Sequence, residues 1–462
     1  MVEFPEGFLL GAATSSYQIE GGVAEGGRGP SIWDDLCRVP GAIADGSDGS
    51  VAADHYHRWR EDVALMKDLG LQAYRFSIAW PRVQPGGKGP LNPEGVAFYD
   101  RLVDALLENG IAPYVTLYHW DLPSELQAAG GWPERDTAER FADYAGLMAE
   151  ALGDRVAAWA TLNEPWCSAW LGYGAGVHAP GLRDHGLAIQ AAHHLMLGHG
   201  KAVEAMRAVR PEAQLGVVCN FLPIRLSDGA SEAARLSASR MDQTINQWFA
   251  GAALEGRYPE DLSTYLAPAL DAVLREGDLA QIAQPLDWFG VNYYNDGLFQ
   301  QASTPGPDDQ GSFPGAGAVA GVQPEVATDI GWPITPEGLG ALLRRLRDEH
   351  PHLPPLYITE NGAAYDDPMG PDGSIDDARR VAFLDAHLRS LLDAVRDGVD
   401  VRGYFAWSLM DNFEWAEGYR MRFGIVHVDY ETQRRTPRRS ALWYRDVIRA
   451  RALPAEPVAW PE

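Results

Sequence analysis

Residues 159–165 read Trp-Ala-Thr-Leu-Asn-Glu-Pro, and residues 356–362 read Leu-Tyr-Ile-Thr-Glu-Asn-Gly. Each stretch is a run of strand-forming residues that ends in a glutamate, Glu164 or Glu360, followed within two positions by a strand breaker. A carboxylate is costly to bury without a partner, and no cation stands beside either glutamate in the sequence. Both strands are therefore predicted to end at a cavity. Since the glutamates are 196 residues apart (360 − 164), only a large closed fold can bring them together.

The same pattern, a short apolar strand followed by a longer amphipathic segment, repeats along the chain. The near-continuous apolar runs are typical of a parallel sheet that is covered on both faces. Eight such strands are predicted, at residues 8–13, 73–80, 112–120, 157–163, 214–220, 286–294, 355–360 and 401–409. Eight strands that alternate with helices predict the α/β class and a single (β/α)8 TIM barrel with long βα loops, spanning residues 1–462 as one domain.

Side chains that cap helices mark several of the expected helix starts. Asn92 followed by a proline predicts one start, because proline is favoured at the first helical position. Asp136 with a glutamate three residues later predicts a capping box. Ser374 predicts a third start, ahead of a buried stripe of valines and leucines.

Residues 300–323 interrupt this rhythm, because they are rich in Gly, Pro, Ser, Ala and Asp and show no apolar period. They predict a surface insertion after the sixth strand. Since the active sites of such barrels are built from the loops that follow the strands, the insertion is also a candidate for the rim of a pocket.

Charge and cysteine content exclude several classes of protein. The chain of 462 residues has a net charge of −26, whereas nucleic-acid and anionic-membrane binding need a basic surface. Its three cysteines, Cys37, Cys167 and Cys219, form no C-x-x-C, which disfavours a disulfide framework and a structural zinc site. The acidic first residues, a short apolar run at 8–10 and the lack of about 20 consecutive apolar residues favour a cytoplasmic protein.

The second predicted strand places a charged side chain inside the barrel. Period-2 alternation puts the bulky Tyr74 and Phe76 on one face and Arg75 on the other. Because bulky residues are expected to face the helices, Arg75 points inward, where a guanidinium needs a carboxylate or several other acceptors. The strand alone leaves two possibilities: an ion pair with a carboxylate at another strand end, such as Glu360, or a structural ion pair elsewhere in the barrel.

Polar and aromatic side chains also gather at the predicted strand ends. Each of them alone fits a capped strand end or a packed ring. Together, fixed hydrogen-bonding groups beside flat indole faces are what a sugar requires, since it offers many hydroxyls and apolar C–H faces. The set comprises Gln18, residues 118–121 (Tyr-His-Trp-Asp), Asn292, Tyr294, Trp407, Glu414 and Trp415.

Residues 161–165 (TLNEP) and 358–362 (ITENG) resemble the two signature motifs of family 1 glycoside hydrolases, the β-glucosidase family. Further matches lie in the family's order over almost the whole chain, at residues 8–21, 74–80, 118–121, 291–294 and 407–415. The resemblance implies a (β/α)8 barrel and retaining hydrolysis of small β-glycosides, such as cellobiose, short oligosaccharides and aryl or alkyl glucosides. It implies no cofactor and no metal.

Carried over position by position, the resemblance implies that Glu164 is the acid/base and Glu360 the nucleophile. An ionised Glu360 is expected to raise the pKa of Glu164, so that Glu164 holds the proton that it must donate. The resemblance also implies that Trp407 stacks on the sugar and that Trp332 lies on the aglycone side. It implies that the nucleophile and the 2-hydroxyl are surrounded by Asn292, Tyr294 and Arg75. The residues that it implies hold the sugar are Gln18, His119, Trp120, Asn163, Glu414 and Trp415.

Competing interpretations make different demands on the sequence. Relatives that act on 6-phosphorylated sugars resemble one another in a Ser and a Lys-x-Tyr group after the eighth strand, whereas residues 414–419 here are acidic and contain no lysine. A metal-dependent barrel hydrolase would use a pair such as His55 and His57, but these follow Asp54 at a predicted helix start, where a capped surface turn is expected. A non-catalytic carbohydrate-binding barrel, or β-galactosidase or β-fucosidase specificity within the same family, stays open as an alternative.

Overall fold

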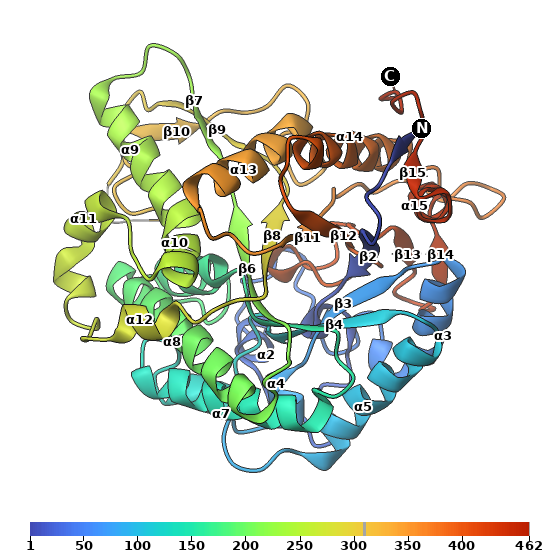
Figure 1. Ribbon diagram of the computed structural model, residues 1–462, viewed down its shortest axis with the longest axis horizontal. Helices are drawn as coiled ribbons and strands as arrows, with labels where there is room; N and C mark the ends of the chain where they lie inside the picture. The colour runs from blue at the N-terminus through green and yellow to red at the C-terminus, as the bar shows by residue number, and fades with distance from the viewer. Residues whose placement is uncertain (308–310, 462) are drawn as a thin grey trace.

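The computed structural model describes residues 1–307 and 311–461, and Figure 1 shows strands at its centre with helices around them. Eight strands, each parallel to its neighbours, close into a barrel in the spatial order β11-β12-β2-β3-β4-β5-β6-β8, and β8 pairs again with β11. They are β2 (Leu9–Ala13), β3 (Ala73–Ser77), β4 (Ala112–Tyr118), β5 (Ala158–Asn163), β6 (Leu215–Phe221), β8 (Trp288–Tyr293), β11 (Leu356–Asn361) and β12 (Val401–Trp407). The predicted (β/α)8 barrel is therefore confirmed.

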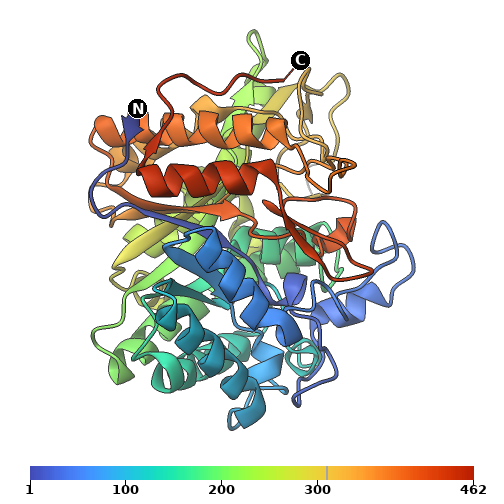
Figure 2. The ribbon, with the colours of Figure 1, turned by 90° about the vertical axis from the view of Figure 1, so that its right-hand side faces the viewer.

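Helices follow the barrel strands and cover the outside of the barrel, as two views at right angles show (Figures 1 and 2). The main ones are α3 (His55–Asp68), α5 (Pro93–Glu108), α7 (Arg135–Leu152), α8 (His185–Val209), α10 (Trp248–Glu255), α13 (Pro336–Glu349), α14 (Ala378–Arg396) and α15 (Arg439–Ala450). The loops hold shorter helical segments: α1 (Ser16–Ile19), α2 (Ile32–Cys37), α4 (Trp80–Val83), α6 (Ser124–Ala128), η1 (Cys167–Gly174), α9 (Glu232–Asp242), η2 (Gln243–Gln247), α11 (Glu260–Leu270), α12 (Asp278–Ile282) and η3 (Trp415–Glu417). Within the described ranges, no helix combines the length and the apolar character needed to cross a membrane.

The helix starts were predicted with mixed success. Asn92 caps α5 as predicted. Asp136, however, lies inside α7 and pairs with Arg140 (3.0 Å) instead of capping the helix. Helix α14 begins at Ala378, after Ser374, whose hydroxyl donates to Asp372 (2.7 Å). Both of these predictions are wrong because a polar side chain near a helix end has several local partners, and the sequence pattern does not choose among them.

The barrel wall separates two apolar layers, as strand alternation requires. Tyr74 and Phe76 of β3 pack in the large core between the barrel and the helices. The interior at the opposite face is filled by aromatic rings, with the Tyr114 centroid 6.3 Å from that of Trp288 and 5.1 Å from that of Phe405. Because Tyr114 and Trp288 stand near the start of their strands, they fill the N-terminal half of the barrel and leave the C-terminal end for a cavity.

The segments outside the barrel form three small sheets among the described residues. β7 (Ile224–Leu226), β9 (Gly297–Gln301) and β10 (Val319–Gly321) form a three-stranded sheet in the order β10-β9-β7. The insertion predicted at 300–323 thus contains β10 and the end of β9, while its residues 308–310 lie outside the described part. β13 (Val426–Val428) pairs with β14 (Arg435–Pro437), and β1 (Val2–Glu3) pairs with β15 (Ala452–Leu453), which brings the two chain ends together in Figure 1.

Candidate active site

A cavity of about 590 Å³ opens at the C-terminal end of the barrel, where enzymes of this fold place their active sites. Side chains at or just after the ends of most barrel strands line it: His119 after β4, Glu164 after β5, Asn220 and Phe221 in β6, Asn292 in β8, Glu360 in β11 and Trp407 in β12. The predicted insertion reaches the same cavity through Phe313 and Gln323. Barrel closure has therefore brought the two distant glutamates into one chamber.

Glu360 is buried in this chamber and has two strong donors. Arg75 Nη1 donates to Oε1 (2.7 Å), and the Tyr294 hydroxyl donates to Oε2 (2.8 Å). Burial raises the pKa of Glu360, and the charge of Arg75, with the hydrogen bonds from Arg75 and Tyr294, opposes that rise. A negative charge on Glu360 is thus stabilised directly, by a cation and by a hydroxyl donor.

Arg75 donates hydrogen bonds to residues of more than one strand. Besides Glu360, its guanidinium donates through Nη2 to Asn163 Oδ1 (2.6 Å), and through Nε to Thr116 (3.2 Å). The ion pair that the sequence suggested between Arg75 and Glu360 is therefore present, and the alternative of a pair elsewhere in the barrel is wrong. A planar guanidinium with several acceptors fixes β3, β4, β5 and β11 relative to one another below the cavity.

Glu164 has a different environment, with no ion pair among the described residues. Asn292 donates to Oε1 (2.7 Å), and the Cys167 thiol donates to Oε2 (3.1 Å). Burial raises the pKa of Glu164 to about 8, and the negative charge of Glu360 adds to that rise. The sequence prediction named the charge of Glu360 as the cause, whereas burial contributes more.

The backbone is left-handed at three residues that line the cavity. φ is +78° at Trp120, +47° at Glu164 and +50° at Trp415. Such conformations disfavour side chains other than glycine, and they gather at functional sites where the surrounding fold holds them in place. Each of these residues follows a strand end or begins a loop turn, so that its side chain is directed by the scaffold.

The predicted sugar-binding residues fall into two layers. His119, Trp120, Trp407, Glu414 and Trp415 line the cavity. The ring of His119 is nearly parallel to two indoles: its centroid is 5.9 Å from that of Trp407, at 16°, and 5.9 Å from that of Trp415, at 17°. Burial, with the nearby Arg75 charge, holds the pKa of His119 well below its ordinary value, so the imidazole is neutral.

Gln18 and Asn163 lie behind this first layer and hold it. Gln18 Nε2 donates to Asn412 Oδ1 (2.9 Å) and, at 3.4 Å, to Glu414 Oε2. The Asn163 side-chain Nδ2 lies 3.1 Å from His119 Nε2, and the Asn163 main-chain carbonyl accepts from Trp120 Nε1 (3.0 Å). Neither Gln18 nor Asn163 is among the residues that line the cavity, and direct contact of these two with a sugar stays a prediction.

The outer part of the cavity has a largely apolar wall. Trp332 is in this wall, with its ring centroid 5.2 Å from that of Tyr294 and 5.9 Å from that of Phe423. No lysine or arginine is among the described residues that line the cavity, whereas five carboxylic acids are: Glu164, Asp296, Glu360, Glu414 and Glu417. An anionic group would meet repulsion here, which agrees with the acidic character predicted for residues 414–419.

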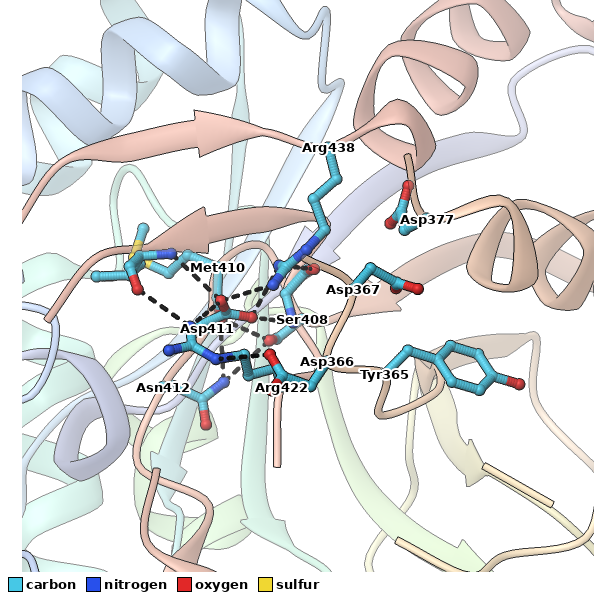
Figure 3. A network of polar contacts seen from close by, with 12 residues as sticks. Tyr365, Asp366, Asp367, Asp377, Ser408, Met410, Asp411, Asn412, Arg422 and Arg438 are labelled. Atoms are coloured by element: carbon cyan, nitrogen blue, oxygen red, sulfur yellow. Dashed lines mark hydrogen bonds and ion pairs between the residues drawn. The ribbon is translucent and has the colours of Figure 1, made fainter. Parts of the chain in front are cut away.

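The loop after β12, which carries Glu414 and Trp415, is anchored by a buried carboxylate (Figure 3). Arg438 makes two bonds to Asp411 (2.8 and 2.9 Å), and Arg422 adds a third (2.7 Å) from another side. Burial alone would raise the pKa of Asp411, but the charges of Arg438 and Arg422 bring it below the usual range. The next residue, Asn412, accepts from Gln18, so this anchor connects directly to one of the predicted sugar-binding residues.

Three contributing residues were not predicted for the site. Cys167 touches Glu164, Asn412 holds Gln18, and Phe423 packs on Trp332. A usable signal existed only for Cys167, which follows Glu164 by three positions and therefore returns to the same side if a turn begins there. Asn412 and Phe423 depend on how the loop after β12 folds back, which the sequence pattern does not reveal.

The His55–His57 pair is not arranged as a metal site. His55 is buried and bonded to Asp62 (2.7 Å), while His57 is exposed and contacts Asp54 and Glu25. The predicted capped surface turn describes His57 but is wrong for His55, whose buried ring lies against Phe98 of α5. Across the part of the chain that the structure describes, no group of three or more His, Cys, Asp or Glu side chains is placed to hold a metal ion.

Comparison with known proteins assigns the chain to a family. The profile of Glycosyl hydrolase family 1 matches residues 1–453. A β-glucosidase from Agrobacterium sp. is 48% identical over 443 residues (96% of this chain and 94% of that protein). A bifunctional β-D-glucosidase/β-D-fucosidase from Bifidobacterium breve is 48% identical over 467 residues (96% and 98%). The family 1 β-glucosidase structure from Thermotoga maritima superposes with a TM-score of 0.93 at 42% identity (98% and 100%). The chain therefore belongs to glycosyl hydrolase family 1 and is a glycoside hydrolase.

Proposed function

We propose that this hydrolase is a retaining β-glucosidase that removes terminal β-D-glucosyl residues from short oligosaccharides and from aryl or alkyl glucosides. The observation that carries the proposal is the contrast between two buried carboxyl groups in one cavity. Glu360 has a cation and a phenol as partners, whereas Glu164 has an amide and a thiol. Environments that push the pKa values of two carboxyl groups apart in this way distinguish a nucleophile from an acid/base. In this proposal, residues 1–462 act as one catalytic unit.

The first half-reaction uses the two groups together. Ionised Glu360 attacks the anomeric carbon as the bond from that carbon to the aglycone oxygen breaks, and Glu164 gives its proton to the departing oxygen. A glucosyl ester on Glu360 and a free alcohol result. The pKa of Glu164, raised to about 8 by burial and by the Glu360 charge, keeps the required proton in place at neutral pH.

In the second half-reaction, Glu164 acts as a base and Glu360 is the leaving group. Once Glu360 is esterified it has no charge, so one cause of the raised pKa of Glu164 is gone. Glu164 then removes a proton from water as the water oxygen attacks the anomeric carbon and the ester bond to Glu360 breaks. Two inversions leave the product sugar with the configuration of the substrate.

Retention also needs the two carboxyl groups to be close, about 5–5.5 Å apart. Asn292 supports this requirement, because its amide donates to Glu164 and is also one of the groups that oppose the burial-driven rise in the pKa of Glu360. A side chain that acts on both carboxyl groups leaves little room for a water between them, which an inverting enzyme requires.

The cavity walls suggest how the substrate lies. The neutral His119, with Glu414 and Trp415, offers polar groups to the hydroxyls, and the indole of Trp407 offers a flat face to the sugar C–H groups. The apolar outer wall around Trp332 suits an aryl or alkyl aglycone. The described residues that line the cavity include several carboxylic acids and no lysine or arginine, which disfavours a phosphorylated sugar.

A second candidate is wider specificity for the sugar, including β-fucosides or β-galactosides. The relative from Bifidobacterium breve is named for both glucosidase and fucosidase activity. A non-catalytic sugar-binding role has less support, because both glutamates are present with the strongly perturbed environment that catalysis needs.

Three measurements test the proposal. Release of 4-nitrophenol from a panel of aryl β-glycosides, followed by cello-oligosaccharides, ranks the sugars, and the glucoside is expected to give the highest kcat/KM or to tie with the fucoside. Proton NMR of the first product should show the β anomer before mutarotation. A 2-deoxy-2-fluoro glucoside with a good leaving group should label Glu360, as read by peptide mass spectrometry. An α product, or a label on another residue, would overturn the mechanism.

A further inference from the structure

The Cys167 thiol makes a contact that the mechanism above does not use. Its Sγ lies 3.1 Å from Glu164 Oε2, and the side chain is buried while still lining the cavity. The other oxygen, Oε1, receives the amide of Asn292 at 2.7 Å. The two oxygens of the acid/base carboxyl are thus held by donors of different kinds, one a strong neutral donor and the other a weak one.

The backbone holds this thiol close to the Glu164 carboxyl group. Glu164 follows β5 in a left-handed conformation, and the Cys167 backbone N–H donates to the Glu164 backbone carbonyl at 3.0 Å. The helical segment η1 (Cys167–Gly174) begins at that turn. Because the turn closes over three residues, the two side chains stand on the same side of the chain. The contact is therefore set by rigid backbone on both partners.

Building on the proposed β-glucosidase function, we propose that the Cys167 thiol is a positioning residue. It holds Oε2 of Glu164 and sets how readily that carboxyl releases and recovers its proton. Oε1 accepts the amide N–H of Asn292, so in the acid form the proton resides on Oε2, the oxygen beside the thiol. Cys167 thus touches the atom from which the proton leaves.

The direction of the effect follows from hydrogen bonding. When Glu164 is ionised, the S–H group donates to a negatively charged oxygen, which is stronger than its contact with a neutral carboxyl. The thiol therefore favours the ionised form and opposes the rise that burial causes in the pKa of Glu164. Because a thiol is a weak donor, this opposition is mild, and the carboxyl can serve as acid first and as base later.

Other groups also act on Glu164, and the experiment has to hold them constant. They come from the strands and loops packed around it: Arg75 on β3, Tyr294 after β8, Glu360 on β11 and Glu414 after β12. The neutral His119 after β4 and the Cys219 thiol on β6, whose own pKa burial and the Glu164 charge raise, make no hydrogen bond to Glu164 among the described residues. None of these is altered when Cys167 is replaced by a residue of similar or smaller size.

The test compares pH profiles of kcat/KM for 4-nitrophenyl β-glucoside in the wild type, Cys167→Ser and Cys167→Ala. The basic limb of this profile reports the pKa of the essential acid in the free enzyme. A hydroxyl is the stronger donor, so Cys167→Ser should move the basic limb to lower pH, and Cys167→Ala should move it to higher pH. Each shift is expected to be about half a pH unit.

Cys219→Ala is the matched control, since Cys219 is also buried near Glu164 but its thiol makes no hydrogen bond to that carboxyl in the described part of the chain. It should leave the basic limb in place. Carbon-13 NMR of labelled glutamate carboxyls gives a second measure that does not depend on turnover, and thermal unfolding checks each fold. If Cys167→Ala fails to fold, the nearly isosteric Cys167→Ser decides alone.

The outcomes separate this inference from the proposed function. The role of the thiol would be overturned if the basic limb did not move, or if it moved in the same direction in Cys167→Ser and Cys167→Ala. Neither result would affect the glucosidase activity of the wild type. A wild-type enzyme that releases no 4-nitrophenol from the β-glucoside would overturn the proposed function itself, before any variant is made.

Discussion

Arg75 Nη1 lies 2.7 Å from Glu360 Oε1, although 285 positions separate the two residues in the chain. Both are almost fully buried, and the same guanidinium also bonds Asn163, the residue before Glu164. One cation therefore supports the charge on one carboxyl group and the backbone position of the other. This arrangement makes Arg75 the residue through which the two halves of the site are kept in register.

Replacing Arg75 by lysine should raise the pH at which the acid limb of kcat/KM falls. Lysine keeps the charge but loses the planar fork, so Glu360 and Asn163 cannot both be bonded as before. Loss of one charge-assisted bond should lower kcat/KM by about 10- to 100-fold. The acid limb should move upward because an ionised Glu360 is less well supported.

Arg82→Lys is the matched control for that variant. Arg82 is also buried and pairs with Glu20 (2.9 Å), away from the residues that line the cavity. It should cost a similar amount of stability in thermal unfolding and leave the acid limb where it was. An unchanged acid limb in Arg75→Lys would contradict the support of Glu360 described above.

Azide should distinguish the two glutamates by the product that it forms. Glu360→Gly removes the nucleophile and should abolish hydrolysis, and azide that enters its place should convert the β-glucoside into the α-glucosyl azide. Glu164→Ala leaves the nucleophile, so azide should attack the glucosyl ester from the opposite face and give the β-glucosyl azide. Proton NMR of the anomeric position reads both products, and exchanged outcomes would reverse the assigned roles.

Glu414→Gln should make stability less sensitive to alkaline pH. Burial raises the pKa of Glu414 to about 8, with the charges of Glu360, Glu164 and Glu417 adding to the rise. The folded state then holds a proton that the unfolded state releases above about pH 4.3, so the wild type loses stability as pH rises from there through 8. Glutamine has no proton to lose, so the variant should gain a few kcal/mol relative to the wild type over that window.

Thermal unfolding at pH 5 and pH 8 measures this difference, and the exposed Glu6→Gln serves as control. A gap between wild type and Glu414→Gln that stays constant with pH would argue against a buried, protonated Glu414. The same variant should raise KM for the glucoside, because Glu414 lines the cavity and holds the sugar in the proposed function.

Asp411→Asn should weaken both the fold and substrate binding. Asparagine preserves the shape but leaves Arg438 and Arg422 without their carboxylate, and breaking a buried ion pair costs about 3–5 kcal/mol. The anchored loop carries Glu414 and Trp415, so KM should rise together with the loss of stability. Tm and KM are the two measurements.

Asp377→Asn gives the matched comparison for Asp411→Asn. Asp377 is fully buried, pairs with Arg380 and lies in the same region of Figure 3, but it is outside the loop that carries Glu414 and Trp415. It should lower Tm without a matching rise in KM. Equal effects of the two variants on KM would show that the Asp411 anchor has no special influence on the site.

Local patterns in the sequence were sufficient for the barrel and for the strand ends that carry the two glutamates. Apolar runs of strand length, alternating with amphipathic segments, depend on interactions within a few residues, and so does the inward direction of Arg75. The strand predicted at 73–80 ended at Ser77, because Trp80 begins a short helix whose packing involves distant segments. The failed helix starts at Asp136 and Ser374 have a different origin, since competing local partners decide them.

Tertiary structure alone decided which side chains meet. That Glu360 receives Arg75 and Tyr294 while Glu164 receives Asn292 and Cys167 follows from barrel closure and from the turn after β5. The same holds for Gln18, which donates to Asn412, and for Asn163, which accepts from Arg75. The physical reason is that a strand pattern encodes the face to which a side chain points, whereas burial, distance and pKa depend on groups hundreds of residues away.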